Sequence, residues 1–350
     1  MPSEAKNRTL FELPDVPVLQ NLLYESAHDA IKCSTGQIKL VESQRTGLIF
    51  NERFDAAIMG YENEYLSSPE ISQSFQIHLE HTATIVQKYL GNEGLVEIGS
   101  GQGYFLELLA HRGASIVGYD PSYAGTNPSI KKSYFTDVEP STTAGNFILR
   151  HVLEHIENPM QFLQKLGESS KDALVYIEVP CFDWICTNRS WVDIFYEHVN
   201  YFRLSDFSRI FREVIDCGHV FGGQYFYIVA NLSSLNAQVQ EPQTPIDFPS
   251  DFMTLNFAQS PAVPISVWGA GAKGVMFALH AIRAGYTINH AIDINPAKQG
   301  KFIPATGIEV ISAEQAMRDL PNGYPIYVMN NNYLEEIKKM TLNKFQYLKA

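Results

Sequence analysis

The stretch that decides the fold is residues 95–122, LVEIGSGQGYFLELLAHRGASIVGYDPS. A short apolar run leads into a glycine-rich turn, and an amphipathic segment follows over residues 104–111. A second apolar run, residues 115–119, stops at Asp120. This order predicts a strand, a tight turn, a helix and a second strand closed by an acidic residue. It is typical of the nucleotide-binding half of a doubly wound α/β sheet.

The glycine turn has the form E-x-G-x-G-x-G, in which Glu97 precedes Gly99, Gly101 and Gly103. A dinucleotide fingerprint instead presents a helix N-terminus to a pyrophosphate, and a carboxylate beside that group is unfavourable. S-adenosylmethionine (SAM) carries an ammonium and a sulfonium and no phosphate, so it suits Glu97, and Asp120 is placed to accept its ribose hydroxyls. We expect SAM here; the alternatives are NAD and a turn whose glycines are only structural.

Bulk composition narrows the class of protein. The 350 residues suggest two domains or slightly more, and 45% hydrophobic with 18% charged residues argues against wholesale disorder. The formal net charge of −12 argues against a general nucleic-acid binder. We therefore expect a small molecule, and no nucleic acid, as the partner.

The spacing of the cysteines bears on metal binding, and the length of the apolar runs bears on cellular location. Four cysteines are scattered without a C-x-x-C pair, which argues against a zinc knuckle and a disulfide framework. The N-terminus has no apolar signal region, and no run approaches about 18 apolar residues. We expect a cytoplasmic protein with no membrane partner.

Domain organisation follows from changes in composition. Residues 1–75 form a mixed N-terminal lobe or lid, and residues 76–235 alternate strand and helix patterns, which predicts a mostly parallel sheet. Residues 236–263 are rich in Pro, Gln and Ser and predict a linker. A second α/β lobe is expected over residues 264–350.

Local patterns predict particular elements. Residues 72–89 favour a helix with one apolar face, and Pro159 favours the start of another. Residues 146–150 favour a buried strand, and short strands are expected over residues 38–42 and 47–50.

A second glycine turn, residues 269–274 (GAGAKG), matches G-x-G-x-x-G and has Asp293 downstream. Taken alone it suggests NAD, but a lone fingerprint is a weak signal. Lys273 within it could meet a phosphate as a point charge. The lobe therefore binds an acceptor, binds NAD or is purely structural.

His151, Glu154 and His155 spell H-x-x-E-H, which is similar to an inverted zinc-peptidase motif. That motif needs a helix and a third carboxylate ligand, whereas here it follows a predicted strand. We expect a wall of the cofactor site, with His151 near the cofactor, or core histidines, and no metal site.

Two aromatic segments carry candidate catalytic groups. The run FYEHVNYF over residues 195–202 contains His198, a natural general base, although a packed aromatic layer is the alternative. Adjacent Glu197 shares a site with it only if the backbone is irregular there. Tyr61 and Tyr65 are either packing residues or part of a lid over the reaction centre.

These motifs together resemble a known family. Eight segments are similar to segments of three-part SAM-dependent methyltransferases that include sugar C-methyltransferases. They are EIGSGQG, GYDPS, RHVLEHIENP, IEVP, YEHVNYF, FGGQ, WGAGAKG and DINPAKQGKFIP. The resemblance runs from about Val18 to Ile337. It implies an α/β fold with a class I methyltransferase Rossmann-like core, a small N-terminal lobe and a C-terminal Rossmann-like lobe.

The N-terminal lobe departs from the family pattern. That lobe usually carries a four-cysteine zinc site, but ESQRTGLIFN stands where C-x-x-C-G-L would be, with Ser43 and Thr46 at the cysteine positions. Hydroxyl groups are poor zinc ligands beside thiolates. We expect this lobe to bind no zinc.

The resemblance also implies residue roles. His198 corresponds to the proposed base, supported by Glu197, and His155 or His151 corresponds to the family's histidine before the core helix. Tyr65, or else Tyr61, would close over the substrate.

The acceptor's handle is expected at two further positions, Lys273 and Gln224 in the FGGQ turn. Both are polar groups near predicted strand ends.

The expected activity is SAM-dependent methylation of a small-molecule acceptor. The resemblance points to C-methylation of a nucleotide-linked keto-sugar after deprotonation alpha to its carbonyl. Alternatives are O- or N-methylation of another metabolite, a SAM-binding module without turnover, and an NAD oxidoreductase that uses the C-terminal lobe. The sequence determines neither the acceptor nor the oligomeric state.

Overall fold

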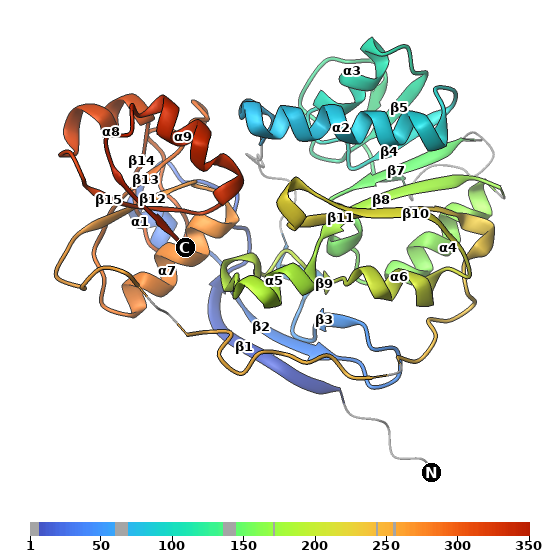
Figure 1. Ribbon diagram of the computed structural model, residues 1–350, viewed down its shortest axis with the longest axis horizontal. Helices are drawn as coiled ribbons and strands as arrows, with labels where there is room; N and C mark the ends of the chain where they lie inside the picture. The colour runs from blue at the N-terminus through green and yellow to red at the C-terminus, as the bar shows by residue number, and fades with distance from the viewer. Residues whose placement is uncertain (1–6, 60–68, 136–144, 171, 243, 255–256) are drawn as a thin grey trace.

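The structure, a computed structural model, describes residues 7–59, 69–135, 145–170, 172–242, 244–254 and 257–350. These residues build three sheets of four, seven and five strands. Figure 1 shows helices on both sides of the seven-stranded sheet, the five-stranded sheet at the left and the long N-terminal strands below both. We call the parts built on these sheets the N-terminal lobe, the middle unit and the C-terminal lobe.

The middle unit has the predicted α/β architecture. Its strand order is β10-β11-β8-β7-β4-β5-β6, in which β11 runs antiparallel to both neighbours and the others are parallel. The strands are β4 (Leu95–Ile98), β5 (Ile116–Tyr119), β6 (Ile130–Lys131), β7 (Asn146–Arg150), β8 (Leu174–Pro180), β10 (Val214–Val220) and β11 (Tyr225–Asn231). This arrangement confirms the predicted fold class.

Helices cover the two faces of this sheet. On one face pack α2 (Gln73–Leu90) and α3 (Tyr104–His111), and on the other α4 (Pro159–Ser169) and α6 (Leu204–Ile210). A strand covered on both faces is apolar throughout. In β7, Phe147, Ile148 and Leu149 are all fully buried, in accord with this rule.

Helix ends follow their sequence signals. The predicted helix over residues 72–89 is α2, whose N-cap Ser72 accepts a hydrogen bond from the Phe75 amide at 3.4 Å. Pro159 opens α4, where its missing N–H is harmless, and Asn158 is the N-cap. The predicted strand over residues 146–150 is β7.

The N-terminal lobe is an antiparallel sheet, with α1 (Ala27–Ile31) between its first two strands. Its order is β1-β2-β3-β9, and β9 comes from the middle of the chain. The strands are β1 (Arg8–Pro17), β2 (Thr35–Glu42), β3 (Ile49–Asn51) and β9 (Asn200–Tyr201). β2 and β3 coincide closely with the predicted short strands, but β1 was not predicted. Two irregularities in its pairing with β2 break the alternation of buried and exposed residues.

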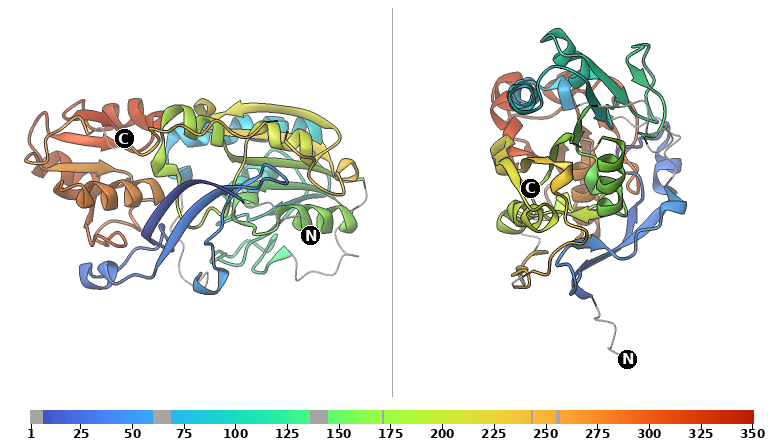
Figure 2. Two further views of the ribbon diagram at one scale, coloured as in Figure 1. Left: turned by 90° about the horizontal axis from the view of Figure 1, so that it is seen from below. Right: turned by 90° about the vertical axis from the view of Figure 1, so that its right-hand side faces the viewer.

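The N-terminal strands cross the junction between the other two units (Figure 2). On one side, the Arg283 guanidinium of the C-terminal lobe donates to the carbonyls of Pro14 and Asp15. On the other side, Ile49 of β3 pairs with Tyr201 of β9. The N-terminal lobe is therefore hydrogen-bonded to both units.

The turn between β2 and β3 is closed by the hydroxyl groups of Ser43 and Thr46, the two positions where the family resemblance implies zinc cysteines. Ser43 Oγ accepts from the Thr46 amide at 3.1 Å, and Thr46 Oγ1 accepts from the Leu48 amide at 3.4 Å. The lack of zinc in this lobe stays a prediction, and these hydrogen bonds give both side chains another role.

Two arginines from the middle unit hold the same turn. Arg203 donates to the Gly47 carbonyl at 2.9 Å, and Arg209 donates to the Thr46 carbonyl. Both guanidinium groups also contact the fully buried Asp206, and the Arg203 pair measures 2.9 Å. One buried carboxylate thus orients both arginines toward the N-terminal lobe.

The C-terminal lobe is a parallel sheet in the order β14-β13-β12-β15-β16. It comprises β12 (Ile265–Trp268), α7 (Ala272–Arg283), β13 (Ile288–Ile292), β14 (Val310–Ile311), α8 (Ala313–Asp319), β15 (Pro325–Val328), α9 (Leu334–Met340) and β16 (Gln346–Lys349). Glu336 of α9 accepts hydrogen bonds from Ser72 Oγ at 2.7 Å and from the Gln73 and Ser74 amides at 3.1 Å. A carboxylate at a helix N-terminus is favourable, so this contact joins the lobe to α2.

The helices in the described part of the chain were compared with the length and apolar character that a membrane-spanning helix needs. None of its helices is both long and apolar enough to span a bilayer.

We expect Asp206→Ala to lower the free energy of unfolding by about 3–5 kcal/mol, because it leaves two guanidinium groups without their buried partner. Urea unfolding followed by tryptophan fluorescence measures the change. The matched control, Asp251→Ala, removes the exposed partner of Arg189 and should cost less than about 1 kcal/mol. Equal effects of the two substitutions would contradict this account of the turn.

Candidate active site

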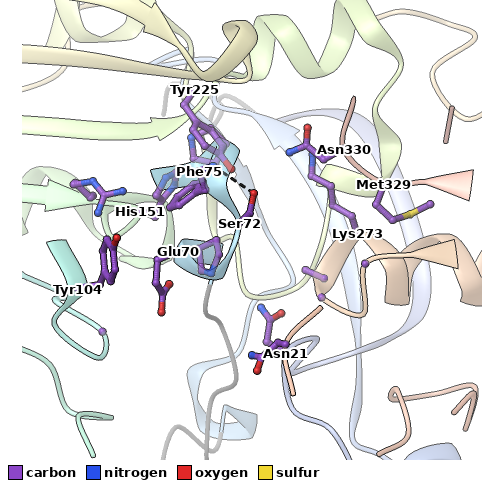
Figure 3. A pocket seen from close by; sticks show the side chains of 18 of the residues that line it. Asn21, Glu70, Ser72, Phe75, Tyr104, His151, Tyr225, Lys273, Met329 and Asn330 are labelled. Carbon is purple, nitrogen blue, oxygen red and sulfur yellow. Dashed lines mark hydrogen bonds between the residues drawn. The ribbon is translucent and has the colours of Figure 1, made fainter. Parts of the chain in front are cut away.

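One cavity of about 550 Å³ lies between the middle unit and the C-terminal lobe. Its lining includes the glycine turn after β4, the end of β7 and the glycine turn after β12. Figure 3 shows Lys273 and Asn330 of the C-terminal lobe on one side and His151 and Tyr104 of the middle unit on the other. The two nucleotide-type turns predicted from sequence therefore border a common space.

The three glycines of the first turn differ in what surrounds them. A Cβ on Gly99 would lie 2.4 Å from Val152, whereas one on Gly101 would meet nothing within 4 Å. Both glycines line the cavity and have positive φ angles of 72° and 55°. Gly103 is the N-cap of α3, and a Cβ there would lie 2.4 Å from Ile130. The structure thus uses Gly103 for packing against β6 rather than for the wall of the cavity.

Asp120 closes the first turn from the end of β5. One carboxylate oxygen accepts from the Gly101 amide at 2.7 Å, and the other accepts from the amide and hydroxyl of Ser122 at 2.8 and 2.6 Å. Asp120 also lines the cavity. Acceptance of ribose hydroxyls by Asp120 stays a prediction.

Glu97 of β4 is a buried carboxylate facing the cavity. It is 1% exposed, and its Oε2 atom has no hydrogen-bond partner. Burial raises the pKa of Glu97 to about 7, Arg150 opposes this shift, and Asp120 adds to it. An unsatisfied carboxylate in this place fits a ligand that brings a positive group.

A second buried carboxylate, Glu178 of β8, was not singled out from the sequence. It accepts from the Tyr176 hydroxyl at 2.8 Å and the Thr82 hydroxyl at 3.2 Å, and its Oε1 lies 3.0 Å from His78 Nε2. The only local signal is one charged residue in the apolar run LVYIEVP. Although burial acts in the opposite direction, Arg150 and the neighbouring histidines hold the pKa of Glu178 well below its usual range.

His151 joins Glu178 to the cavity wall. It follows β7 with a positive φ of 53°, and its two ring nitrogens lie 3.2 Å from Glu178 and 3.4 Å from Glu154. Burial acts to lower the pKa of His151, but the two carboxylates raise it to about 9. The two carboxylates thus favour the protonated form of His151 at the place predicted for a cofactor contact.

Glu154, His155 and His198 form a second cluster beside the first. One potential ligand atom from each lies within 4.8 Å of the others. Glu154 and His155 lie in a 3-10 turn, Leu153–His155, and not in the helix that a zinc-peptidase motif needs. His155 Nδ1 lies 2.8 Å from the Glu197 carbonyl, and the rings of His155 and His198 meet at 4.9 Å.

The structure separates the side chains of Glu197 and His198. His198 lines the cavity, and burial, with His155 and His151 nearby, holds its pKa well below the usual range. The Glu197 carboxylate accepts from the Gln20 amide at 3.0 Å, on the side of the N-terminal lobe. Glu197 therefore contacts the histidine cluster through its backbone carbonyl.

Both predicted acceptor contacts line the cavity, Gln224 from the middle unit and Lys273 from the C-terminal lobe. Gln224 Oε1 accepts from Asn330 Nδ2 at 2.8 Å, and Lys273 Nζ lies 2.8 Å from Asp193. Tyr61 and Tyr65 lie outside the described residues.

The second glycine turn repeats the hydrogen bonding of the first. Asp293 accepts from the Ala270 amide at 2.8 Å, much as Asp120 accepts from Gly101. A lysine is added here: Lys298 Nζ lies 3.3 Å from Asp293, and the residue is only 7% exposed. The sequence patterns did not single out Lys298.

Fold and site together define the class of protein. Three features are typical of a class I methyltransferase. They are the seven-stranded sheet with its antiparallel strand β11, the glycine turn after β4, and the acidic residues on β4 and after β5. The unsatisfied Glu97 and the open Gly101 fit SAM, which the cavity would hold against the first turn.

Comparison with known proteins gives the family. A family model described as a methyltransferase domain matches residues 80–214, and one described as a C-methyltransferase C-terminal domain matches residues 252–346. These matches agree with the fold and the site, and together they show a SAM-dependent methyltransferase. The expected class of enzyme and its cofactor SAM are confirmed.

Individual relatives are distant. The C-methyltransferase NovU of Streptomyces niveus is 26% identical over 286 residues, covering 69% of this chain and 67% of NovU. A Burkholderia thailandensis 1,6-didemethyltoxoflavin-N1-methyltransferase, solved with bound 1,6-didemethyltoxoflavin and S-adenosylhomocysteine, is 12% identical, covering 44% of this chain and 77% of that one, with a TM-score of 0.34. A SAM-dependent methyltransferase from Archaeoglobus fulgidus is 16% identical, covering 46% and 100%, with a TM-score of 0.34.

We expect SAM affinity to depend on the protonation of Glu97. With a pKa of about 7, part of the free protein carries a neutral Glu97 at neutral pH. A cationic ligand favours the carboxylate, so binding below pH 7 releases a proton. Affinity should fall by up to about tenfold per unit as pH decreases from about 7 to 5.5.

Calorimetry in buffers of different ionisation enthalpy measures both the affinity and the released proton. Glu97→Gln should bind SAM more weakly and remove the released proton. Glu107→Gln, which changes an exposed acid on α3, is the matched control and should keep the pH dependence. A proton release that persists in Glu97→Gln would assign the titration to another group.

Proposed function

We propose that the protein transfers a methyl group from SAM to a carbon next to a carbonyl group, in an acceptor that is a nucleotide-linked keto-sugar. The observation that carries the proposal is that both glycine turns border the same cavity, with His198 in its lining. The C-methyltransferase C-terminal domain and the similarity to NovU support methylation at carbon.

The middle-unit side of the cavity favours a cationic donor. Glu97 and Asp120 supply negative charge there, and Gly101 leaves room beside the turn. When bound, SAM supplies an electrophilic methyl group and leaves as an uncharged thioether. The residues of the first turn would hold and orient it, which is the part of catalysis that positioning supplies.

The C-terminal side favours an anionic handle. Helix α7 spans 12 residues, and its N-cap Gly271 makes no side-chain capping bond. Lys298 Nζ would lie 3.7 Å from a Cβ on Gly271, so a buried cation stands beside the helix N-terminus. A phosphate group is stabilised by both features. Both lysines are ion-paired, Lys273 with Asp193 at 2.8 Å and Lys298 with Asp293 at 3.3 Å. In our proposal Lys298 takes the role expected of Lys273, because its ammonium is the one beside Gly271.

Methylation at carbon requires a base. In our proposal an imidazole nitrogen of His198 accepts the proton alpha to the carbonyl, and the electron pair of that C–H bond forms the new bond to the methyl carbon. His155 and Glu197 position His198. The Glu197 carbonyl orients His155, and the ring of His155 contacts the ring of His198. Walls built from the middle unit and the C-terminal lobe surround the reacting groups, which limits the access of water.

We expect His198→Ala to abolish exchange of the acceptor's alpha proton with deuterated solvent, because the base is removed. A panel of nucleotide-linked keto-sugars is incubated with the enzyme and SAM in deuterium oxide. Mass spectrometry then identifies the methylated sugar and the exchanged position. The loss in the rate of methyl transfer should be at least about 100-fold, the range in which general bases contribute.

SAM binding by calorimetry should be unchanged in His198→Ala, which separates loss of the base from loss of the fold. His219→Ala, on the exposed side of β10, is the matched control. A product methylated at oxygen or nitrogen, or full turnover by His198→Ala, would refute the proposed chemistry.

Lys298→Met should raise the KM for the nucleotide-linked acceptor by about 10- to 100-fold, because a charge-assisted contact to phosphate is lost. The SAM dissociation constant should not change. Steady-state kinetics with the methylated panel member and calorimetry with SAM measure the two effects. Lys301→Met, which removes a surface ion pair with Glu25, is the control and should leave KM unchanged. If Lys298→Met leaves KM unchanged, the acceptor's anionic group binds elsewhere.

A further inference from the structure

Glu154, His155 and His198 lie close together beside the cavity. Glu154 is 1% exposed, and neither carboxylate oxygen has a hydrogen-bond partner. The nearest positive group is His151, whose Nδ1 lies 3.4 Å from Glu154 Oε1. A buried carboxylate with unsatisfied oxygens is costly unless a cation approaches it.

The two histidines supply the nitrogen atoms of this cluster. The Glu197 carbonyl can only accept, so His155 Nδ1 carries the hydrogen and its Nε2 keeps the lone pair. This backbone carbonyl is the kind of outer partner that orients metal-ligating histidines. His198 is 8% exposed, and its Nδ1 atom is buried without a partner.

We propose that Glu154, His155 and His198 form a binding site for a divalent transition-metal ion of the zinc type. One ligand atom from each residue lies within 4.8 Å of the others. Two imidazoles and one carboxylate suit zinc rather than magnesium, which prefers oxygen ligands and water. Three protein ligands beside a cavity leave a coordination position open.

This proposal departs from the expectation that the chain has no metal ligands. That expectation rested on Ser43 and Thr46 in the N-terminal lobe and on the spacing of H-x-x-E-H. Folding instead pairs Glu154 and His155 with His198, which is distant in sequence. Among the described residues, this trio is the group of histidine and acidic side chains close enough to hold an ion.

The functional consequence rests on the proposed role of His198. An ion bound there occupies a lone pair that proton transfer needs, so metal binding opposes deprotonation of the acceptor. The metal is then a reversible inhibitor of methyl transfer, removed by a chelator, and the metal-free form is the active one.

Cobalt(II) is the probe for this site, because its visible absorption reports coordination by nitrogen and oxygen. The full chain, treated with chelator and without SAM or acceptor, is titrated with cobalt and then with zinc as competitor. We expect saturable binding of one ion per chain. Glu154→Gln and His155→Ala should each weaken cobalt binding at least tenfold, and His111→Ala, an exposed histidine on α3, should not.

Calorimetry with SAM checks that each variant is folded. Absence of saturable binding, or binding that is unaffected by both Glu154→Gln and His155→Ala, would overturn the site. Because this measurement uses neither SAM nor acceptor, its failure is distinct from failure of the proposed function. Zinc should then inhibit methylation of the identified panel member, and stimulation by zinc would overturn the inhibitory role.

Discussion

A completely buried carboxylate, Glu178, ties the walls of the cavity to the middle sheet. A buried charge is tolerated only when charged and hydrogen-bonding groups surround it. Those groups come from different elements: His78 and Thr82 from α2, and Arg150 and His151 from the end of β7. The position of α2 and the end of β7 therefore depend on one side chain. Since both elements border the cavity, its shape depends on that carboxylate as well.

The parts of this arrangement that could be predicted are those whose signals are local. Glu97, the glycines and Asp120 lie within one strand–turn–helix–strand unit, so spacing alone places them on a common edge. Helix α2 and strand β7 likewise follow from the period of their apolar residues. β1 escaped prediction because irregular pairing breaks its alternation. Glu178 escaped because its partners on α2 come from a distant part of the sequence.

The histidine cluster shows the same limit more strongly. H-x-x-E-H suggests a partnership of His151 with His155, because a helix would place them on one face. The chain makes a 3-10 turn there instead, and His155 faces His198. His198 reaches this place because β9 leaves the middle unit to pair with β3, and because Glu197 contacts Gln20 of the N-terminal lobe. No spacing in the sequence encodes these contacts.

The two glycine turns show how one topology comes to favour ligands of opposite charge. Each follows a buried strand, opens a helix and donates an amide to an aspartate at the end of the next strand. Two residues before its first glycine, the middle unit has Glu97 and the C-terminal lobe has Val267. Near the aspartate, only the C-terminal turn has a buried lysine, Lys298, among the described residues. The backbone amides of both turns are suited to anions. The added carboxylate reverses that preference at the first turn and the added lysine strengthens it at the second, so the two turns favour ligands of opposite charge at two parts of the cavity wall.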